Sequence, residues 1–408
     1  MRVIWLSFVI FVFGMFKVFI REGRHQHKTI SQRGIIDMLP VGLDLGNGAV
    51  KLVMRGLELS IPNVTAVGSP RSDLGERQEP LNALDVEVVS SAFTDGARRV
   101  FVGKLAADQG PQATYMQPNE KKTSSEQAIL MYLTALASAV VKQRERAGER
   151  ISSATTIDEE LFVVSGVSLV EALERGVRLD FEQRLSGEHT VRFMSPSPWG
   201  GITVRLRITS KVVSEGHMAF LALCQQSPEK SKELSSSLVA VAEIGELSTE
   251  LPVFERGNIN ASLSDGLQYG IGTTLTSLLE DIREQTKARN AFPGGRMELA
   301  KFLEDKKREV VLFGRRHDIT EIIERHLSAA ASHVYREIIE VWNKIPTIEH
   351  FYVLGGGAAL LHPFLKEFAQ QDGFNLEYAP TLYRSRWLNA DGMFLTAVRL
   401  AADTVTAV

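Results

Sequence analysis

Apolar residues follow two patterns along this chain. Four short runs are continuously apolar, which is typical of strands buried on both faces: residues 41–45, 161–167, 239–244 and 351–354. Two longer segments, residues 124–146 and 320–342, instead carry apolar positions at helical spacing. Buried strands interleaved with amphipathic helices predict an α/β architecture.

Two of the apolar runs end in similar turns that contain glycine. The sequence DLGNG at residues 44–48 is followed by a second predicted strand, residues 50–54, and then by Arg-Gly. The sequence EIGEL at residues 243–247 is followed in the same way by a predicted strand at residues 250–254 and by Arg-Gly. Two such hairpins, about two hundred residues apart, predict two lobes that face each other. Between them, residues 62–125 hold five prolines and predict a small irregular subdomain.

The turns have residue types that suit phosphate and a divalent cation. Glycines at a hairpin tip let backbone N–H groups approach a phosphate. Asp44 can hold Mg²⁺ through water, because Mg²⁺ keeps several of its waters and needs one or two carboxylates. Lys51 can bind phosphate oxygens as a point charge. Further along, three glycines in the sequence LGGGA (residues 354–358) leave bare backbone against which a base or ribose can lie.

These three turns, in this order, resemble the nucleotide-binding loops of the superfamily of actins, heat-shock chaperones and sugar kinases. DLGNGAVK (residues 44–51) is similar to the first phosphate loop, AEIGELSTE (242–250) to the second, and VLGGGAALL (353–361) to the adenosine loop. Three further segments are similar to bacterial ParM proteins, which segregate plasmids, and to their archaeal relatives: VGKLAAD (102–108), VVSGVSLVEA (163–172) and NADG (389–392).

The resemblance covers about residues 38–408 and implies a two-lobed actin-like fold, related to ribonuclease H, with a nucleotide cleft between the lobes. It implies that residues 38–240 form domain I, that 241–380 form domain II, and that 381–408 return to domain I. Residues 1–37 are left as an apolar extension.

The resemblance also implies roles for single residues. Asp44 and Glu243 would hold Mg²⁺, and Glu215 and Glu243 would be catalytic, with Glu215 orienting the attacking water. A solvated residue at a strand end is the other interpretation of Glu215. The residues implied to bind the nucleotide are Asp44, Gly46, Asn47, Gly48, Lys51, Gly245, Ser248, Thr249, Gly355, Gly356 and Gly357.

The second phosphate loop departs from the family pattern, which is Asp-x-Gly-Gly/Asp-x-Thr. Glu243 is one methylene longer than the usual aspartate, and Leu247 removes a glycine-like backbone contact. Glu246 adds a carboxylate, which lowers the affinity for a triphosphate unless a cation compensates. This loop therefore predicts altered metal handling, slow hydrolysis or a degenerate site.

The amino terminus has four interpretations. Residues 3–20 are almost wholly apolar, with Lys17 as their one charge, and are close to the length that spans a bilayer. The segment can also be a signal peptide, or an anchor with its carboxyl side in the cytoplasm, since basic residues follow it. The fourth interpretation is that translation begins at Met38. The sequence leaves these four open.

The net charge and the cysteine content limit the functions that this protein can have. The formal net charge is −3, from 46 basic and 49 acidic residues, which argues against direct nucleic-acid binding. The single cysteine, Cys224, excludes an internal disulfide and fits a cytoplasmic protein.

We therefore expect an actin-like ATPase that binds ATP or GTP with Mg²⁺ and polymerises with itself. The family resemblance implies plasmid or DNA segregation through an adaptor protein, with membrane contact only if residues 3–20 are retained. The alternatives are a non-hydrolysing, membrane-tethered scaffold and a small-molecule kinase of the same superfamily.

Overall fold

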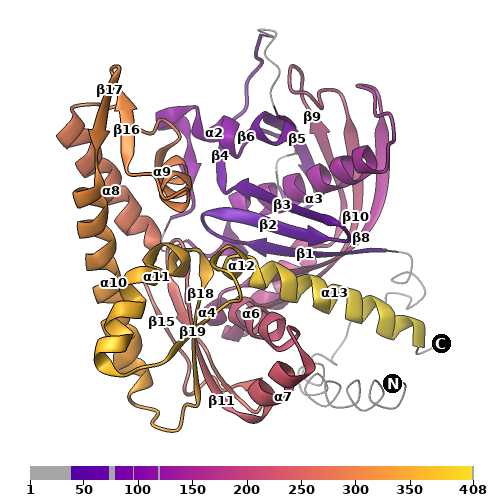
Figure 1. Cartoon of the computed structure of the whole chain (residues 1–408). Helices are drawn as coiled ribbons and strands as arrows, with labels where there is room; N and C mark the ends of the chain where they lie inside the picture. The colour runs from indigo at the N-terminus through magenta and orange to yellow at the C-terminus, as the bar shows by residue number, and fades with distance from the viewer. Residues whose placement is uncertain (1–37, 73–78, 95, 118–119, 407–408) are drawn as a thin grey trace.

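The computed structural model describes residues 38–72, 79–94, 96–117 and 120–406, which form two lobes (Figure 1). The apolar segment at residues 3–20 lies outside the described residues. Among the helices that the structure describes, none is both long enough and apolar enough to cross a membrane.

The first lobe is built on a ten-stranded sheet. In spatial order its strands are β3 (Leu57–Pro62), β2 (Ala49–Met54), β1 (Leu39–Leu45), β8 (Thr156–Val167), β10 (Thr203–Ser214), β9 (Gly187–Phe193), β5 (Leu84–Ser90), β6 (Arg98–Val102), β4 (Val64–Val67) and β7 (Thr114–Tyr115). The three central strands β1, β8 and β10 are parallel, and the others pair antiparallel with their neighbours. Parallel strands place their carboxyl ends at one edge, so the turn after β1 lies beside the ends of β8 and β10.

Helices cover both faces of this sheet. The helices of the first lobe are α2 (Lys104–Ala107), α3 (Glu126–Arg146), α4 (Leu169–Leu173), α5 (Val177–Leu185), α6 (Glu215–Cys224) and α13 (Leu388–Thr406), with the short 3₁₀ turns η2 (Pro80–Asn82), η3 (Gly110–Gln112) and η4 (Lys122–Ser124). Side chains alternate along β1. Leu43 shares the core with α3, whereas Gly42 faces α13 on the opposite side.

Two glycines let α13 approach the lobe at backbone distance. A Cβ atom on Gly42 would lie 2.2 Å from the backbone nitrogen of Phe394 in α13. A Cβ atom on Gly392 would lie 2.0 Å from the backbone oxygen of Met218 in α6. Real Cβ atoms do not come this close to backbone, so only glycine fits at either position. The last described helix is therefore packed tightly onto β1, the first described strand.

The second lobe has its own seven-stranded sheet. Its strands are β11 (Leu238–Ile244), β12 (Thr249–Leu251), β13 (Val253–Glu255), β14 (Asn258–Ile259), β15 (Asp265–Leu267), β18 (His350–Leu354) and β19 (Leu376–Tyr378). Its helices are α7 (Pro228–Ser236), α8 (Ile271–Thr286), α9 (Gly295–Glu304), α10 (Thr320–Trp342) and α11 (Gly355–Asp372), and a hairpin of β16 (Glu309–Leu312) and β17 (Arg315–Asp318) projects beside α9 (Figure 1). The strands β11, β18 and β19 are parallel, and α12 (Leu382–Ser385) leads the chain back toward the first lobe.

Two predictions about strands were wrong. The strand predicted at residues 250–254 is broken at Pro252 into β12 and β13, because proline has no N–H to donate to the neighbouring strand β11. Residues 62–125 are not an irregular subdomain, since they supply β4 to β7 of the large sheet. Pro80 and Pro111 stand at the start of 3₁₀ turns, where a missing N–H costs nothing.

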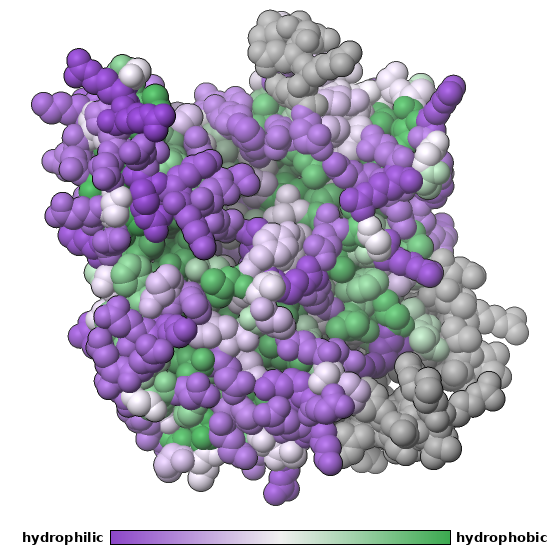
Figure 2. All heavy atoms as spheres, in the orientation of Figure 1, coloured by the Kyte–Doolittle hydropathy of each residue, from purple (hydrophilic) through white to green (hydrophobic). Residues whose placement is uncertain are grey.

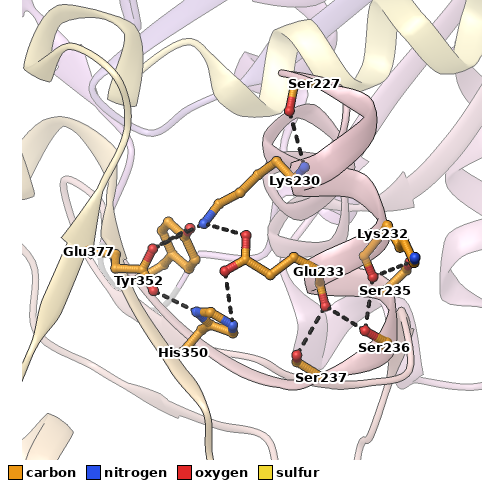
Figure 3. A network of polar contacts seen from close by, with 10 residues as sticks. All are labelled: Ser227, Lys230, Lys232, Glu233, Ser235, Ser236, Ser237, His350, Tyr352 and Glu377. Carbon is orange, nitrogen blue, oxygen red and sulfur yellow. Dashed lines mark hydrogen bonds and ion pairs between the residues drawn. The ribbon is translucent and has the colours of Figure 1, made fainter.

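A polar network fixes α7 to the second sheet (Figure 3). The Glu377 carboxylate accepts hydrogen bonds from the Tyr352 hydroxyl at 2.7 Å and from Lys230 Nζ at 3.2 Å, and it lies 2.7 Å from His350 Nδ1. Burial raises the pKa of Glu377, but these three partners outweigh it and hold the pKa below its ordinary value. The network therefore stabilises an ionised carboxylate between β18, β19 and α7.

Candidate functional site

A cavity of about 1010 Å³ lies between the two lobes. Hydrophobic residues gather near the middle of the face in Figure 2, where the surface is hollowed. Every residue that the sequence predicted for the site lines this cavity: Asp44, Gly46, Asn47, Gly48, Lys51, Glu215, Glu243, Gly245, Ser248, Thr249, Gly355, Gly356 and Gly357. Three turns supply most of them: the first turn (residues 46–48), the second turn (245–248) and the third turn (355–357).

The first turn is held by an ion pair at its base. Asp44 and Lys51 are cross-strand partners in β1 and β2, and Lys51 Nζ lies 2.9 Å from Asp44 Oδ2. Asp44 is only 4% exposed. A buried carboxylate needs such a partner, because an unpaired one costs several kcal/mol.

The backbone of the first turn is held by Asn63. Its side-chain amide donates to the Gly46 carbonyl at 3.0 Å, and its backbone N–H donates to the Gly48 carbonyl at 3.0 Å. A Cβ atom on Gly46 would lie 2.6 Å from the Ala49 carbonyl, so glycine is required there. With both carbonyls engaged by Asn63, the turn keeps one shape.

The second turn is tied to the start of α8. The backbone N–H groups of Ile271 and Gly272 donate to the carbonyls of Gly245 at 3.0 Å and Glu246 at 2.8 Å. Thr249 is fully buried, and its hydroxyl donates to the Tyr269 carbonyl at 2.8 Å. The Thr249 hydroxyl therefore anchors the turn within the second lobe.

Glu246 belongs to the second turn, and its side chain points toward the first. A Cβ atom on Gly48 would lie 3.1 Å from Glu246 Oε2, and Glu246 Oε1 lies 3.5 Å from Arg296 Nε in α9. Burial raises the pKa of Glu246, and Arg296 offsets part of this effect. The guanidinium of Arg296 also lies 5.5 Å from the centre of the Tyr115 ring in β7. Arg296 thus joins the second turn to the first lobe.

The three glycines of the third turn have different surroundings. Gly355 has φ +94°, and a Cβ atom on it would lie 2.5 Å from the Ile244 carbonyl. A Cβ atom on Gly357 would lie 2.3 Å from Ile244 Cγ2, whereas one on Gly356 would meet nothing within 4 Å. Gly355 and Gly357 therefore let α11 pack on β11, and Gly356 is the one that leaves open space in the cavity.

Four carboxylates crowd one end of the cavity: Asp44, Glu215, Glu243 and Glu250. Burial holds the pKa of Glu243 well above its ordinary value, and the other three carboxylates raise it further. Glu243 Oε1 accepts a hydrogen bond from the Asn389 side-chain amide at 2.5 Å. Its Oε2 atom is buried without a hydrogen-bond partner. Such a group of like charges is stabilised when a cation joins it.

The donor set fits a hydrated Mg²⁺ ion better than direct coordination. No three His, Cys, Asp or Glu side chains of the described residues converge as metal ligands. Asp44 and Glu243 can still act through water, because Mg²⁺ keeps several of its waters. The unpartnered oxygen of Glu243 gives a water of that ion an acceptor.

The cavity wall contains a buried cation that the sequence did not predict. Lys122 lies in η4 and forms an ion pair with Glu215, and both side chains are buried. Lys122 stands in the polar sequence NEKKTSSE, which resembles a solvated loop. No local signal distinguishes it from Lys121, because its burial depends on contacts with segments far along the chain.

Three consecutive residues at the end of α12 also have contacts at the site that the sequence did not predict. Arg384 pairs at 2.6 Å with Glu58 of the first lobe, and Arg386 pairs at 2.7 Å with Glu304 of α9. Between them, the Ser385 hydroxyl accepts a hydrogen bond at 3.0 Å from the N–H of Gly355. This short segment therefore contacts the first lobe, the third turn and α9 at once.

The fold and the cleft between its lobes define an actin-like protein. Residues 42–216 match the family model described as actin like proteins N terminal domain. Residues 241–367 match the one described as archaeal actin homologue MreB-like, C-terminal. Actin-like family models therefore match both lobes of the chain, which confirms the predicted actin-like fold class and the resemblance to this family.

Solved structures agree with this fold. ParM from Bacillus thuringiensis with ATP aligns with a TM-score of 0.66 at 20% identity, over 89% of this chain and 99% of that one. A 15-stranded ParM filament from Clostridium botulinum gives 0.66 at 15% identity, again over 89% and 99%. The archaeal actin homologue Ta0583 gives 0.63 at 19% identity, over 89% and 100%. Curated protein sequences give no significant match.

Proposed function

We propose that this chain is a nucleotide-dependent, filament-forming actin-like protein that binds and hydrolyses ATP or GTP with Mg²⁺ between its lobes. The observation that carries the proposal is the convergence of the three turns on one cavity. They come from separate parts of the sequence and supply glycine backbone, Lys51 and paired carboxylates. These are the groups that a nucleoside triphosphate with its cation requires.

Each group of residues in the cavity has its own role in this proposal. The N–H groups of the first and second turns and Lys51 bind the phosphates, and the third turn passes the nucleoside. Asp44 and Glu243 would hold hydrated Mg²⁺, which would supply charge neutralisation when bound. Glu215 orients the attacking water and accepts its proton. Phosphoryl transfer depends on this positioning and on charge stabilisation more than on covalent chemistry.

Nucleotide binding would close the lobes, and the closed form would polymerise. The Clostridium botulinum ParM structure is described as a 15-stranded filament, which supports self-association as the proposal for this chain. The proposed biological role is DNA or plasmid segregation in the cytoplasm, with DNA reached through an adaptor protein. The net charge of −3 agrees with indirect contact to DNA.

A non-hydrolysing scaffold is the second candidate, and it rests on Glu246. This carboxylate stands between the first and second turns, where it opposes a triphosphate. In this candidate the protein binds nucleotide weakly or not at all, and residues 3–20 tether it to a membrane.

Sedimentation with light scattering tests the proposal. The full chain is compared with Mg-ATP, Mg-GTP, Mg-ADP and no nucleotide, and phosphate release is followed in parallel. Asp44→Ala should abolish polymer and phosphate release, whereas Asp158→Ala, an exposed carboxylate on β8, should change neither. Polymer that forms equally without nucleotide, or a chain that binds no nucleotide in calorimetry, would reject the proposal in favour of the scaffold.

A further inference from the structure

Lys122 is a buried ammonium in the wall of the nucleotide cleft. It is 6% exposed, and its Nζ atom donates to Oε1 of Glu215, which is 8% exposed. Burying a charge costs several kcal/mol unless a partner of opposite charge compensates. Here both partners line the cavity, so the pair stands where a reaction would take place and not in a structural core.

The position of Lys122 is fixed by its neighbour in the sequence. The backbone N–H and the hydroxyl of Thr123 donate to Glu171 Oε1 at 3.0 and 2.9 Å. Arg184 of α5 donates to the Thr123 carbonyl at 2.6 Å. Glu171 is itself buried in α4. These contacts anchor η4 to the first lobe, so the Lys122 side chain starts from a fixed backbone.

Glu215 is confined from the other side. It is the first residue of α6 and directly follows β10, so its backbone belongs to two packed elements. A Cβ atom on Gly166 of β8 would lie 2.7 Å from Glu215 Cγ, which places the carboxylate stem tightly against that strand. The ion pair therefore joins two groups that each have little freedom to move.

The charge on Glu215 depends on Lys122. Burial, together with the carboxylates of Asp44 and Glu250, raises the pKa of Glu215 to about 7, although Lys122 lowers it. The pKa of Lys122 lies above its ordinary value, because Glu215 and Asp44 outweigh its burial. Loss of the ammonium would therefore raise the pKa of Glu215 further and favour its neutral form. A protonated carboxyl group cannot accept another proton from water.

We propose that Lys122 is a positioning residue for nucleotide hydrolysis, whose ammonium holds the Glu215 carboxylate in one orientation and favours its ionised form through their buried ion pair. The inference rests on the proposed function. In the step it serves, the water oxygen bonds to the γ-phosphorus, and the bond from that phosphorus to the β–γ bridging oxygen breaks. Glu215 accepts one proton of the water, and the nucleoside diphosphate leaves with the bond's electron pair.

The test is a double-mutant cycle in which the rate of phosphate release is measured for each variant. The variants are Lys122→Met, Glu215→Gln and the double variant, each measured with the full chain at saturating Mg-ATP. Since general-base catalysis contributes roughly 10²- to 10⁴-fold, each single variant should lower kcat by about 10²-fold or more, with a much smaller change in KM. The double variant should be no slower than Glu215→Gln alone, because Lys122 acts through Glu215.

The pH profile separates this role from a structural one. Lys122→Gln should move the acid limb of kcat to higher pH, and Lys122→Arg, which keeps the charge, should restore most of the rate. Arg99→Gln is the matched control. It breaks an ion pair at 3.0 Å with the fully buried Asp85 of the same lobe, outside the cavity wall, and should leave the profile unchanged.

Two results would overturn the proposed role of Lys122. Equal losses from Lys122→Met in the wild-type and Glu215→Gln backgrounds would overturn it, because Lys122 would then act independently of Glu215. An unshifted pH profile in Lys122→Gln would overturn it as well. The single lysine variants leave Glu215 unpaired and can fail to fold. The double variant has no unpaired charge, so it can still be compared with Glu215→Gln.

Failure of the proposed function gives a different result. A wild-type chain that binds no Mg-ATP in calorimetry rejects the function itself. A wild-type chain that binds nucleotide without releasing phosphate rejects hydrolysis, and with it the role of Lys122. A chain that hydrolyses nucleotide at the same rate with and without the Lys122 ammonium rejects only the inference.

Discussion

The Glu246 carboxylate lies against Gly48, so that a Cβ atom on Gly48 would be 3.1 Å from Glu246 Oε2. Gly48 belongs to the first turn and Glu246 to the second. A carboxylate of the second lobe therefore lies close to the backbone of the first turn, where we propose that the phosphates bind. In that proposal, Glu246 adds both bulk and negative charge beside the phosphates.

Removing the charge of Glu246 should strengthen nucleotide binding. Glu246→Gln should raise the affinity for Mg-ATP by about five- to ten-fold, because it removes a partly buried carboxylate beside the phosphates, worth about 1 kcal/mol. Isothermal titration calorimetry measures this, and Glu321→Gln on the exposed face of α10 is the control. Weaker binding would instead mean that Glu246 holds the cation.

Gly355 and Gly356 should respond differently to the same methyl group. Gly355→Ala should lower the free energy of unfolding by about 1–3 kcal/mol, since its φ is +94° and its Cβ would meet the Ile244 carbonyl. Gly356→Ala should leave the free energy of unfolding almost unchanged and weaken nucleotide binding, because its methyl group points into open cavity. Urea unfolding and calorimetry on both variants make the comparison. Equal behaviour of the two would contradict it.

The Arg386–Glu304 ion pair should slow nucleotide release. The pair joins the end of α12 to α9, and both residues line the cavity in which we propose that the nucleotide binds. Arg386→Ala should speed dissociation by about two- to five-fold, the range that a partly exposed ion pair supports. Stopped-flow displacement of a fluorescent nucleotide measures the rate. The charge-reversed pair, Arg386→Glu with Glu304→Arg, should restore slow dissociation. A dissociation rate that stays high in the reversed pair would show that the ion pair does not slow release.

The network around Glu377 should contribute to acid stability. At neutral pH, Glu377→Gln should lower the free energy of unfolding by about 1–3 kcal/mol, the value of hydrogen bonds to a charged group. Because the folded pKa lies below the ordinary 4.5, this contribution is fully present above pH 4.5 and is lost as pH falls through the folded value. Urea unfolding of both proteins at several pH values should show the difference shrinking in acid. A constant difference would mean that the carboxylate charge plays no part.

Much of the scaffold could be predicted because its signals are local. The helix predicted at residues 320–342 is α10 in the structure, and the strand predicted at 239–244 is β11 with one residue added. The second and third glycine turns follow apolar runs that form the neighbouring parallel strands β11 and β18, and the ends of parallel strands meet at one sheet edge. The places of these elements in the fold could therefore be predicted from their order in the sequence.

The side chains that complete the site gave no such signal. Lys122, Arg296 and Arg386 all stand in polar stretches whose burial depends on distant segments. Arg296, for example, meets Glu246 and Tyr115, which lie about 50 and 180 residues away in the chain. A single sequence does not contain those pairings. The strand broken at Pro252 was missed for a different reason, since its apolar pattern continues across the proline.

The packing of α13 on β1 has a consequence for how the protein is made. Gly42 and Gly392 hold this helix against elements that are synthesised hundreds of residues earlier. The second lobe is continuous in sequence, so all its strands leave the ribosome before the first lobe obtains its final helix. Until then the outer face of β1 is uncovered. The lobe that begins the described chain is therefore the one that finishes folding last, and a truncation near the carboxyl end would damage it while sparing the second lobe.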